Sequence, residues 1–346
     1  MCGIAGYIGK ENLNTESIIN ALNLMKNRGP DDQSYLKIKK ENFNVFLLHS
    51  RLSIIDIDKR SNQPFKFENY TIIFNGEIYN FIELRKTLQK SGHVFSTNSD
   101  TEVLLKAYIE YGEDCVNYFN GMWAFAIWDD HKGILFLSRD RFGEKPLYYF
   151  KDCHGLYFGS EVKAIQSLIS KKLLINYNYL KRYLIYGYKF LHKTNETFFE
   201  RLYRLESATN MIISNNSQKK IKFWTPEIKQ NKNMSYEDVV EKSRHYLLNS
   251  IKLRLRSDVP LAFCLSGGID SASLASIAKK CFNYDVVTFS IIDKDERYNE
   301  LDNISATVKD LNCDHFFVEL NYQDIFSKLE NLIEYHDAPI STISYL

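Results

Sequence analysis

Short apolar runs separated by turn residues fill the first half of the chain. Runs of this length, bounded by Gly, Asn, Asp and Ser, are typical of strands. We place strands at residues 44–57, 70–75, 122–128, 133–138 and 156–159. Between them, apolar residues recur at helical spacing, as at Ile18, Ile19, Leu22 and Met25. Strands interleaved with helices predict a layered α+β domain in this half.

Capping residues mark the starts of two further helices. Asn80 and Ser99 are each followed three residues later by a glutamate, which is the spacing of a capping box. Glycine commonly follows the last residue of a helix, so we end the first helix at Gly92 and the second near Gly112.

The pattern changes after a polar stretch at residues 207–232. Beyond it the sequence predicts two helices, at 235–254 and 270–280, and two strands, at 261–265 and 286–292. A strand, a helix and a second strand in this order form a βαβ unit, which is typical of a parallel sheet covered by helices. We therefore predict three parts: a first domain at 2–210, a linker at 211–232, and an α/β domain at 233–346.

Charge and composition exclude several classes of function. The chain has 44 basic and 43 acidic residues, so it lacks the excess of positive charge typical of nucleic-acid binding. No run of 18 or more apolar residues exists, and the opening lacks the basic and then apolar pattern of a signal peptide. Six cysteines without a CxxC pair argue against a protein-bound metal and for reduced thiols. We expect a cytoplasmic protein with no nucleic-acid or membrane partner.

Cys2 is the first candidate for chemistry. It follows the initiator methionine directly, and a small second residue permits removal of that methionine. The freed α-amine would titrate near ~7.7–8.0. It could therefore act as a general base beside the thiol at neutral pH. By its position alone, Cys2 is more simply explained as an incidental cysteine.

Seven segments in chain order change that interpretation. They are MCGIAG, NRGPDDQ (27–33), HSRLSIIDI (49–57), FNGEIYN (74–80), NSDTEVLL (98–105), NGMWAFAIWD (120–129) and SRDRFGEKPLYY (138–149). Together they resemble the N-terminal-nucleophile glutamine amidotransferase domain of glutamine-hydrolysing asparagine synthetases, over roughly residues 2–205. The resemblance implies a four-layer αββα sandwich, with Cys2 as the nucleophile that attacks glutamine.

The resemblance also implies how glutamine is held. The Arg51 guanidinium would bind its α-carboxylate with two parallel hydrogen bonds. The residues that follow would line the same pocket: Leu52, Ser53, Ile54 and Ile55. Arg51 taken alone is better explained as a surface arginine on a strand. The segment Arg139–Pro146 is interpreted as structural or interdomain, and not as catalytic.

Four more residues complete the implied glutaminase site. Glu77 and Asp100 would bind the α-ammonium of glutamine. The side-chain amide of Asn75 and the backbone N–H of Gly76 would stabilise the oxyanion of the tetrahedral intermediate. Each also has a simpler explanation, because Asn-Gly is a common hairpin turn and an acidic residue suits the first turn of a helix.

A second candidate site lies in the predicted α/β domain. Glycines between the strand and the helix would let backbone N–H groups turn toward an anion at the helix N-terminus. This loop lacks the GxxxxGK[ST] pattern but resembles, as SGGxDS, the pyrophosphate loop of ATP pyrophosphatases. The resemblance implies ATP with Mg²⁺ as co-substrate and no prosthetic group. The implied ATP contacts are Leu265, Ser266, Gly267, Gly268, Asp270, Ser271 and Ile291.

The two resemblances together predict a two-step enzyme. Glutamine would give glutamate and ammonia, and in the full-length protein ATP would adenylate aspartate to form asparagine, AMP and diphosphate. The expected partners are glutamine, ATP, and aspartate or another carboxylate acceptor, and a homodimer is allowed. Two alternatives stay open: the same chemistry on another carboxylate, such as that of a sugar, and a module that senses glutamine or nucleotide without turnover. An expected SGEGxDE motif is absent, so we expect a truncated chain without full synthetase activity.

Overall fold

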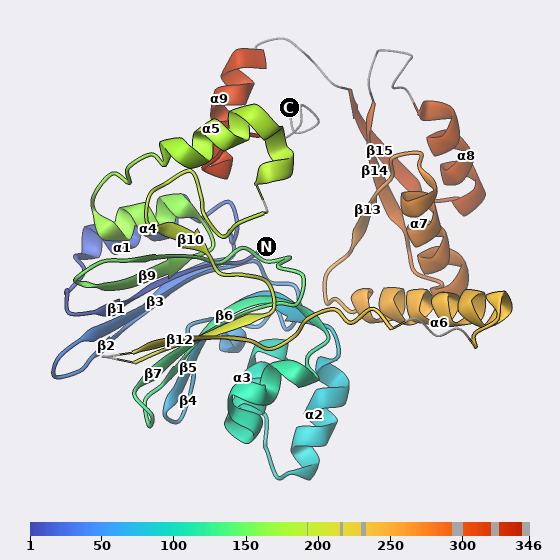
Figure 1. Cartoon of the computed structure of the whole chain (residues 1–346). Helices are drawn as coiled ribbons and strands as arrows, with labels where there is room; N and C mark the ends of the chain where they lie inside the picture. The colour runs from blue at the N-terminus through green and yellow to red at the C-terminus, as the bar shows by residue number, and fades with distance from the viewer. Residues whose placement is uncertain (192, 215–216, 230–232, 293–299, 320–324, 341–346) are drawn as a thin grey trace. The chain divides into compact units, whose positions relative to one another are not determined.

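The structure is a computed structural model that describes residues 1–191, 193–214, 217–229, 233–292, 300–319 and 325–340 (Figure 1). The chain forms two compact units. The first unit comprises Met1–Pro226 and a later segment that begins at Ile333, and the second comprises Glu227–Leu332. No helix in the described part of the chain is both long and apolar enough to cross a membrane.

Two antiparallel sheets form the middle of the first unit. One sheet has the order β10-β8-β9-β1-β3-β2. Its strands are β1 (Gly3–Gly9), β2 (Asp32–Lys39), β3 (Asn44–Arg51), β8 (Tyr148–Lys151), β9 (Gly155–Gly159) and β10 (Leu202–Arg204). The other has the order β12-β11-β7-β6-β5-β4. Its strands are β4 (Phe65–Phe67), β5 (Tyr70–Ile78), β6 (Gly121–Asp129), β7 (Ile134–Arg139), β11 (Thr209–Ile213) and β12 (Gln218–Lys222).

Helices cover the outer face of each sheet (Figure 1). The first sheet is covered by α1 (Thr15–Leu24) and α4 (Val162–Ile169), and the second by α2 (Phe81–Lys90) and α3 (Asp100–Tyr111). The unit also holds α5 (Tyr177–Tyr186) and the short 3₁₀ helices Lys59–Ser61, Gly112–Tyr118 and Gly187–Phe190.

Side-chain alternation along the strands builds this layering. In β1, Ile4 and Ile8 point into the core between the two sheets, whereas Ala5 and Tyr7 point into the core under α1 and α4. A third core joins β5, β6 and β7 to α2 and α3. Three cores separate four layers, so the αββα sandwich is confirmed.

Four of the five predicted strands are confirmed as β5, β6, β7 and β9. The fifth prediction, residues 44–57, is wrong beyond Arg51, where β3 ends. The Arg51 guanidinium donates hydrogen bonds to the backbone carbonyls of Asp56 and Asp58. These bonds fold residues 52–58 back as a loop, although the apolar sequence favours a strand.

The interpretation of Asn75-Gly76 as a hairpin turn is wrong. Both residues lie inside β5, opposite Ala124 and Trp123 of β6. A Cβ at Gly76 would lie 2.1 Å from the carbonyl oxygen of Met122. Glycine is required here because two strands approach closely, not because the chain reverses.

The predicted helix starts are confirmed, but the capping contacts differ. The Asn80 side chain bonds to the loop at 118–120 and makes no capping bond to α2. Ser99 does cap α3, whereas the Glu102 carboxylate accepts N–H groups from residues 96 and 97 instead of the one at Ser99. A distant loop has therefore replaced the helix as the partner of Asn80, and the adjacent residues 96 and 97 have replaced Ser99 as the partners of Glu102.

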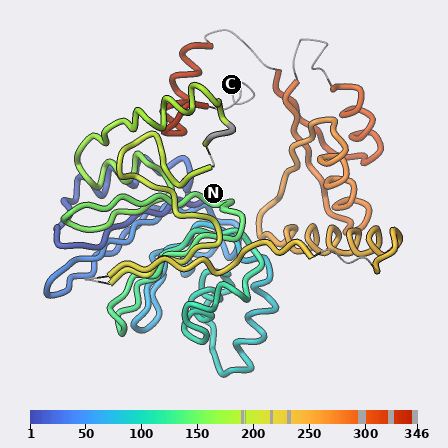
Figure 2. Tube along the Cα trace, viewed as in Figure 1, coloured from blue at the N-terminus to red at the C-terminus, as the bar shows by residue number. Residues whose placement is uncertain are grey.

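The polar stretch near residue 210 contains two strands. The linker predicted at 211–232 begins inside β11, which pairs with β7, and β12 follows as the edge strand (Figure 2). Lysines at 219, 220 and 222 give β12 its polar pattern. Charged residues are common on edge strands because they discourage pairing with other chains.

The second unit confirms the predicted βαβ order. Its elements are α6 (Tyr236–Arg254), β13 (Ala262–Cys264), α7 (Ile269–Phe282), β14 (Val287–Ile292), α8 (Leu301–Leu311) and β15 (Asp314–Glu319). The helix α9 (Ile325–His336) begins in this unit, and its last residues, from Ile333, belong to the first. The three strands pair in parallel in the order β13-β14-β15. The buried core is small, with Ala275, Ala278, Val286 and Leu311 at its centre.

Candidate active site

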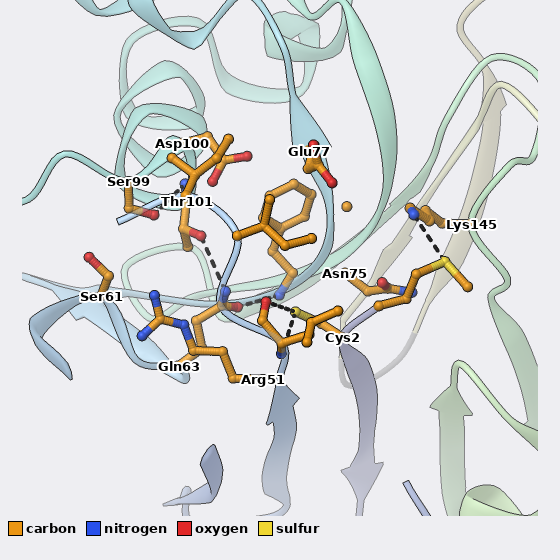
Figure 3. A pocket seen from close by; sticks show the side chains of 16 residues that line it. Cys2, Arg51, Ser61, Gln63, Asn75, Glu77, Ser99, Asp100, Thr101 and Lys145 are labelled. Carbon is orange, nitrogen blue, oxygen red and sulfur yellow. Dashed lines mark hydrogen bonds between the residues drawn. The ribbon is translucent and has the colours of Figure 1, made fainter. Parts of the chain in front are cut away.

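A pocket lies in the first unit where β1, the end of β3, the middle of β5 and the start of α3 meet (Figure 3). Most of the predicted glutaminase residues line it: Cys2, Arg51, Leu52, Ile54, Ile55, Asn75, Gly76, Glu77 and Asp100. Ser53 is the exception, since it is not among the lining residues and its N–H donates to Asp31 at 2.7 Å. Segments far apart in the sequence therefore meet around one cavity.

Cys2 holds its thiol against the backbone of Leu52. The sulfur accepts the Leu52 N–H at 3.4 Å and donates to the Leu52 carbonyl at 3.5 Å. Burial raises the pKa of the thiol, and the Leu52 N–H opposes this only in part. A thiol with a raised pKa needs a nearby base to become a nucleophile.

Met1 occupies one side of the same pocket. Its sulfur lies 3.2 Å from the Lys145 ammonium, as the dashed line in Figure 3 shows. Removal of Met1 would vacate this side and turn the Cys2 nitrogen into a free amine beside the thiol. One cleavage would therefore supply both the space and the base.

Arg51 is fixed by its own loop. Its guanidinium donates three hydrogen bonds, to the carbonyls of Asp56 and Asp58 and to the side chain of Asn62. A guanidinium has five N–H donors, so two remain for a ligand. The planar group is held in place before any carboxylate arrives.

Two carboxylates, the buried Asp100 and the half-buried Glu77, lie on another side of the pocket. Asp100 begins α3 and accepts the Ile78 N–H at 3.0 Å. Burial raises the pKa of Asp100 to about 7, and the neighbouring charge of Glu77 adds to the effect. Burial also raises the pKa of Glu77, against the opposing charge of Lys145. A cationic group bound here would relieve the unfavourable burial of both carboxylates.

Hydrogen-bond donors converge from β5. The side-chain nitrogen and oxygen of Asn75 are both buried without a hydrogen-bond partner in the described part of the chain. Phe74 donates its N–H to Gln63 at 2.6 Å and Ile78 donates to Asp100. Alternate residues of a strand direct their N–H groups to the same edge. The Gly76 N–H, between those two, therefore points to the pocket edge of β5.

The loop predicted to bind ATP lies between β13 and α7 of the second unit. Gly267 has φ +77°, which favours glycine. The hydroxyls of Ser266 and Ser271 lie 3.1 Å apart, and each accepts a backbone N–H of the loop. Gly268 begins α7 without a side-chain cap, so the first-turn N–H groups suit an anion. The hydroxyls and the first-turn N–H groups of this loop suit an anion such as a phosphate.

The two residues predicted beside adenine differ in exposure. Leu265 is 2% exposed and donates its N–H to Phe289 of β14. Ile291 in β14 is 60% exposed. Among the described residues, no group of three or more His, Cys, Asp or Glu could hold a metal ion.

Two protein families match this chain, one in each half of the sequence. The family described as glutamine amidotransferase domain matches residues 1–224, and the family described as asparagine synthase matches residues 242–345. A putative glutamine-hydrolysing asparagine synthetase of Methanocaldococcus jannaschii is 33% identical, over 95% of this chain and 67% of that protein. The chain belongs to the glutamine-hydrolysing asparagine synthetase family.

A Bacillus subtilis member of this family, asparagine synthetase [glutamine-hydrolyzing] 3, is 36% identical over 80% of this chain and 45% of its own length. The chain spans about half to two thirds of the length of these curated relatives. Among solved structures, glutamine phosphoribosylpyrophosphate amidotransferase from B. subtilis aligns with a TM-score of 0.49 and 14% identity, over 94% of this chain and 70% of that one.

Several lining residues of this synthetase-family pocket were not predicted from the sequence. They are Met1, Ser61, Gln63, Phe74, Ser99, Thr101 and Lys145. Gln63 ties β5 to α3, since its amide donates to the Thr101 hydroxyl at 3.2 Å. Lys145 lies in the segment interpreted as structural. That interpretation suits Arg139, which bonds to three backbone carbonyls, but Lys145 enters the pocket.

Proposed function

We propose that this chain hydrolyses glutamine to glutamate and ammonia with Cys2 as the nucleophile. The observation that carries the proposal is one pocket that joins a half-buried cysteine, a fixed guanidinium, one buried and one half-buried carboxylate, and an unpartnered amide in the described part of the chain. Arg51 would bind the α-carboxylate of glutamine, and Asp100 with Glu77 would bind its α-ammonium. Glutamine carries both charged groups on its α-carbon, so the site recognises this end of the molecule by its two charges and leaves the side-chain amide facing Cys2.

The reaction follows from these positions once Met1 is removed. The Cys2 amine takes the thiol proton, and the thiolate attacks the side-chain amide carbon of glutamine. The oxyanion is stabilised by the Asn75 amide and the Gly76 N–H. The C–N bond breaks, the proton passes from the amine to the leaving ammonia, and a γ-glutamyl thioester remains. Water then attacks the thioester, which releases glutamate and restores the thiol.

In the full-length protein we propose that the ammonia is transferred to a carboxylate activated by ATP. The aspartate β-carboxylate attacks the α-phosphorus and diphosphate leaves. Ammonia then attacks the acyl carbon, and AMP leaves as asparagine forms. The loop at 266–271 would hold the phosphates with backbone N–H groups and hydroxyls, and Mg²⁺ would accompany the nucleotide. The fit of the loop and the asparagine synthase match over 242–345 support this half.

The acceptor is the least constrained part of the proposal. Another carboxylate, such as that of a sugar, would use the same ammonia and the same adenylation chemistry. Assay of the full-length protein with glutamine, ATP and either aspartate or other carboxylates separates the two hypotheses. The homodimer stays a prediction that sedimentation of the protein would test.

The glutaminase step is tested with diazo-oxo-norleucine, a glutamine analogue that alkylates a nucleophilic thiol. We expect one label per chain, at Cys2, and loss of both labelling and glutamine hydrolysis in Cys2→Ala. Tight glutamine binding without labelling would instead favour a sensing module. Cys153→Ala is the matched control, because Cys153 is an exposed cysteine that does not line the pocket and its loss should change neither readout.

A further inference from the structure

Four charged side chains of alternating sign lead from the nucleophile to a segment late in the sequence. Arg28 donates to the Cys2 carbonyl at 3.0 Å and pairs with Glu161 at 3.3 Å. The second Glu161 oxygen lies 3.4 Å from the Lys163 ammonium. Lys163 in turn contacts Asp337, through its backbone N–H at 3.0 Å and its ammonium at 4.0 Å. We call these four residues the charged row.

The charged row is largely shielded from water. The side chains of Arg28, Glu161, Lys163 and Asp337 are 11, 10, 19 and 12% exposed. Ion pairs with this exposure are weakly screened, so loss of one partner is felt by the next. By contrast, the Arg182–Glu196 pair of the same unit lies on the surface, at 47 and 36% exposure.

The far end of the charged row comes from an unexpected part of the chain. Asp337 lies within residues 242–345, which match the asparagine synthase family, yet it packs in the first unit. Lys163 also donates to the Tyr335 carbonyl at 2.6 Å, and the Tyr183 hydroxyl donates to the carbonyl of Ile340. A segment of synthetase sequence is therefore docked on the helix layer of the glutaminase unit.

The conformation of Asp337 adds to this picture. It follows α9 with φ +56°, a position where Gly or Asn is usual. The Asp337 carboxylate accepts the backbone N–H of Lys163, in the first turn of α4. Burial raises the pKa of Asp337 to about 6, against the favourable charge of Lys163.

We propose that Glu161, Lys163 and Asp337 are positioning residues for glutamine hydrolysis, which couple docking of the 335–340 segment to the placement of Cys2. Lys163 contacts both Asp337 and Glu161. When Asp337 leaves, Lys163 turns fully to Glu161 and competes with Arg28 for that carboxylate. Arg28 then holds the Cys2 carbonyl less firmly, and the thiol and the amine of the same residue lose their alignment. Release of the synthetase segment would in this way slow ammonia production.

The test measures two properties of Cys2 in the 346-residue chain. One is kcat/KM for glutamine hydrolysis, which rests on the proposed function. The other is the rate of alkylation of Cys2 by iodoacetamide, followed by peptide mass spectrometry, which needs no glutamine turnover. The variants are Asp337→Asn, Glu161→Gln and the double variant. Asparagine keeps the size of Asp337 and suits its positive φ, and Glu196→Gln is the matched control.

We expect Asp337→Asn to lower kcat/KM by roughly 3- to 10-fold, the usual size of such couplings. The change should fall mainly on kcat, and the alkylation rate of Cys2 should change with it. The double variant should be no worse than Glu161→Gln alone, because both act through one row of contacts. Glu196→Gln should match the wild type. Circular dichroism and the melting temperature verify folding, and Lys163→Met replaces any variant that fails to fold.

Two outcomes would overturn the coupling. One is an Asp337→Asn chain whose Cys2 alkylation rate equals that of the control, and the other is a double variant whose two effects multiply. A wild-type chain without glutaminase activity would contradict the proposed function instead. In that case the alkylation rates alone still decide whether the charged row acts on Cys2.

Discussion

The burial of the Asn75 amide is energetically unfavourable for folding, so another role must explain it. Both polar atoms of its amide are buried without a partner in the described structure. A buried polar group left unpaired costs about 1–3 kcal/mol. The amide is better matched to a reaction intermediate than to the resting protein, which is the usual arrangement for an oxyanion donor.

Asn75→Ala should therefore separate activity from stability. We expect kcat for glutamine hydrolysis to fall by about 10²–10³-fold. The free energy of unfolding should stay the same or rise, because an unpaired polar group is removed. Urea denaturation followed by tryptophan fluorescence, beside a glutaminase assay, measures both. A large loss of stability would show that the amide has a structural partner.

Burial of the Asp100 carboxylate should likewise lower the stability of the fold, by an amount that depends on pH. Its pKa is about 7 in the folded chain, above the ordinary 3.8, because burial penalises the charged form. The folded state then binds more protons than the unfolded state between these values, so this group lowers stability as pH rises from about 4 to 7. Asp100→Asn removes the ionisation and keeps an acceptor for the Ile78 N–H. We expect the variant to gain stability over the wild type at pH 8 and little at pH 4.

The same titration should appear in glutamine binding. Below pH 7 the Asp100 carboxylate becomes protonated and no longer attracts an α-ammonium. We expect KM for glutamine to rise as pH falls from 8 to 6 in the wild type. In Asp100→Asn, KM should be high throughout and nearly independent of pH. A KM that responds to pH equally in both proteins would assign the effect to another group.

Strand β5 is the element that organises the pocket. It carries Asn75, Gly76 and Glu77, and its outer edge donates to Gln63 and Asp100. The close approach of β6 at Gly76 fixes the position of β5 relative to β6. A change in that spacing would move the carboxylate and the donors together.

Gly76→Ala tests this spacing. The new Cβ would meet the Met122 carbonyl, so β6 must shift, and we expect a loss of about 1–3 kcal/mol in stability together with loss of glutaminase activity. Gly159→Ala is the control, because a Cβ there would make milder contacts, at 3.2 Å from Ile165 Cγ1 and 3.3 Å from the Ile4 carbonyl oxygen. Equal stability of Gly76→Ala and wild type would show that β5 and β6 accommodate the added methyl group without a shift.

Elements with local signals could be predicted from the sequence. The apolar runs of β5 and β6 and the Ser99 start of α3 needed no distant contact. The glycine-rich β1 and the lysine-rich β12 were missed, because pairing with neighbouring strands and not their composition makes them strands. The loop after Arg51 depends on bonds between a guanidinium and carbonyls that the pattern does not reveal.

The candidate site divides in the same way. Residues next to a recognisable segment, such as Cys2 and Asp100, could be proposed from the order of the motifs. Gln63 could not, since its role is to join β5 to α3 across the fold. The charged row could not be predicted either. Glu161 and Asp337 are 176 residues apart in the sequence, and both contact Lys163 only in the folded chain.

The whole molecule has two units with very different cores. Three clusters of large apolar residues hold the first unit, whereas a few small side chains centre the second. Large exposed apolar side chains, among them Phe316, Phe317 and Val318, lie on β15 of the second unit. Buried apolar surface is the main source of stability, so the second unit should be the weaker one.

Unfolding should accordingly occur in two steps. All three tryptophans, Trp123, Trp128 and Trp224, lie in the first unit, so their fluorescence reports on that unit alone. Far-UV circular dichroism also detects the helices of the second unit. We expect the dichroism to change at a lower temperature or urea concentration than the fluorescence does. Coincident transitions would mean that the two units unfold as one.

Met1 in the pocket has a practical consequence for making the protein. Any sequence fused ahead of Met1, such as an affinity tag, would keep the Cys2 nitrogen in a peptide bond and leave the pocket filled. Such a preparation would fold and yet be inert, and its inactivity could be mistaken for a missing cofactor. The chain should be expressed with a native start, in a host whose methionine aminopeptidase keeps pace with synthesis. The mass of the intact protein, lighter by one methionine, would then show that Met1 has been removed and that Cys2 has a free α-amine.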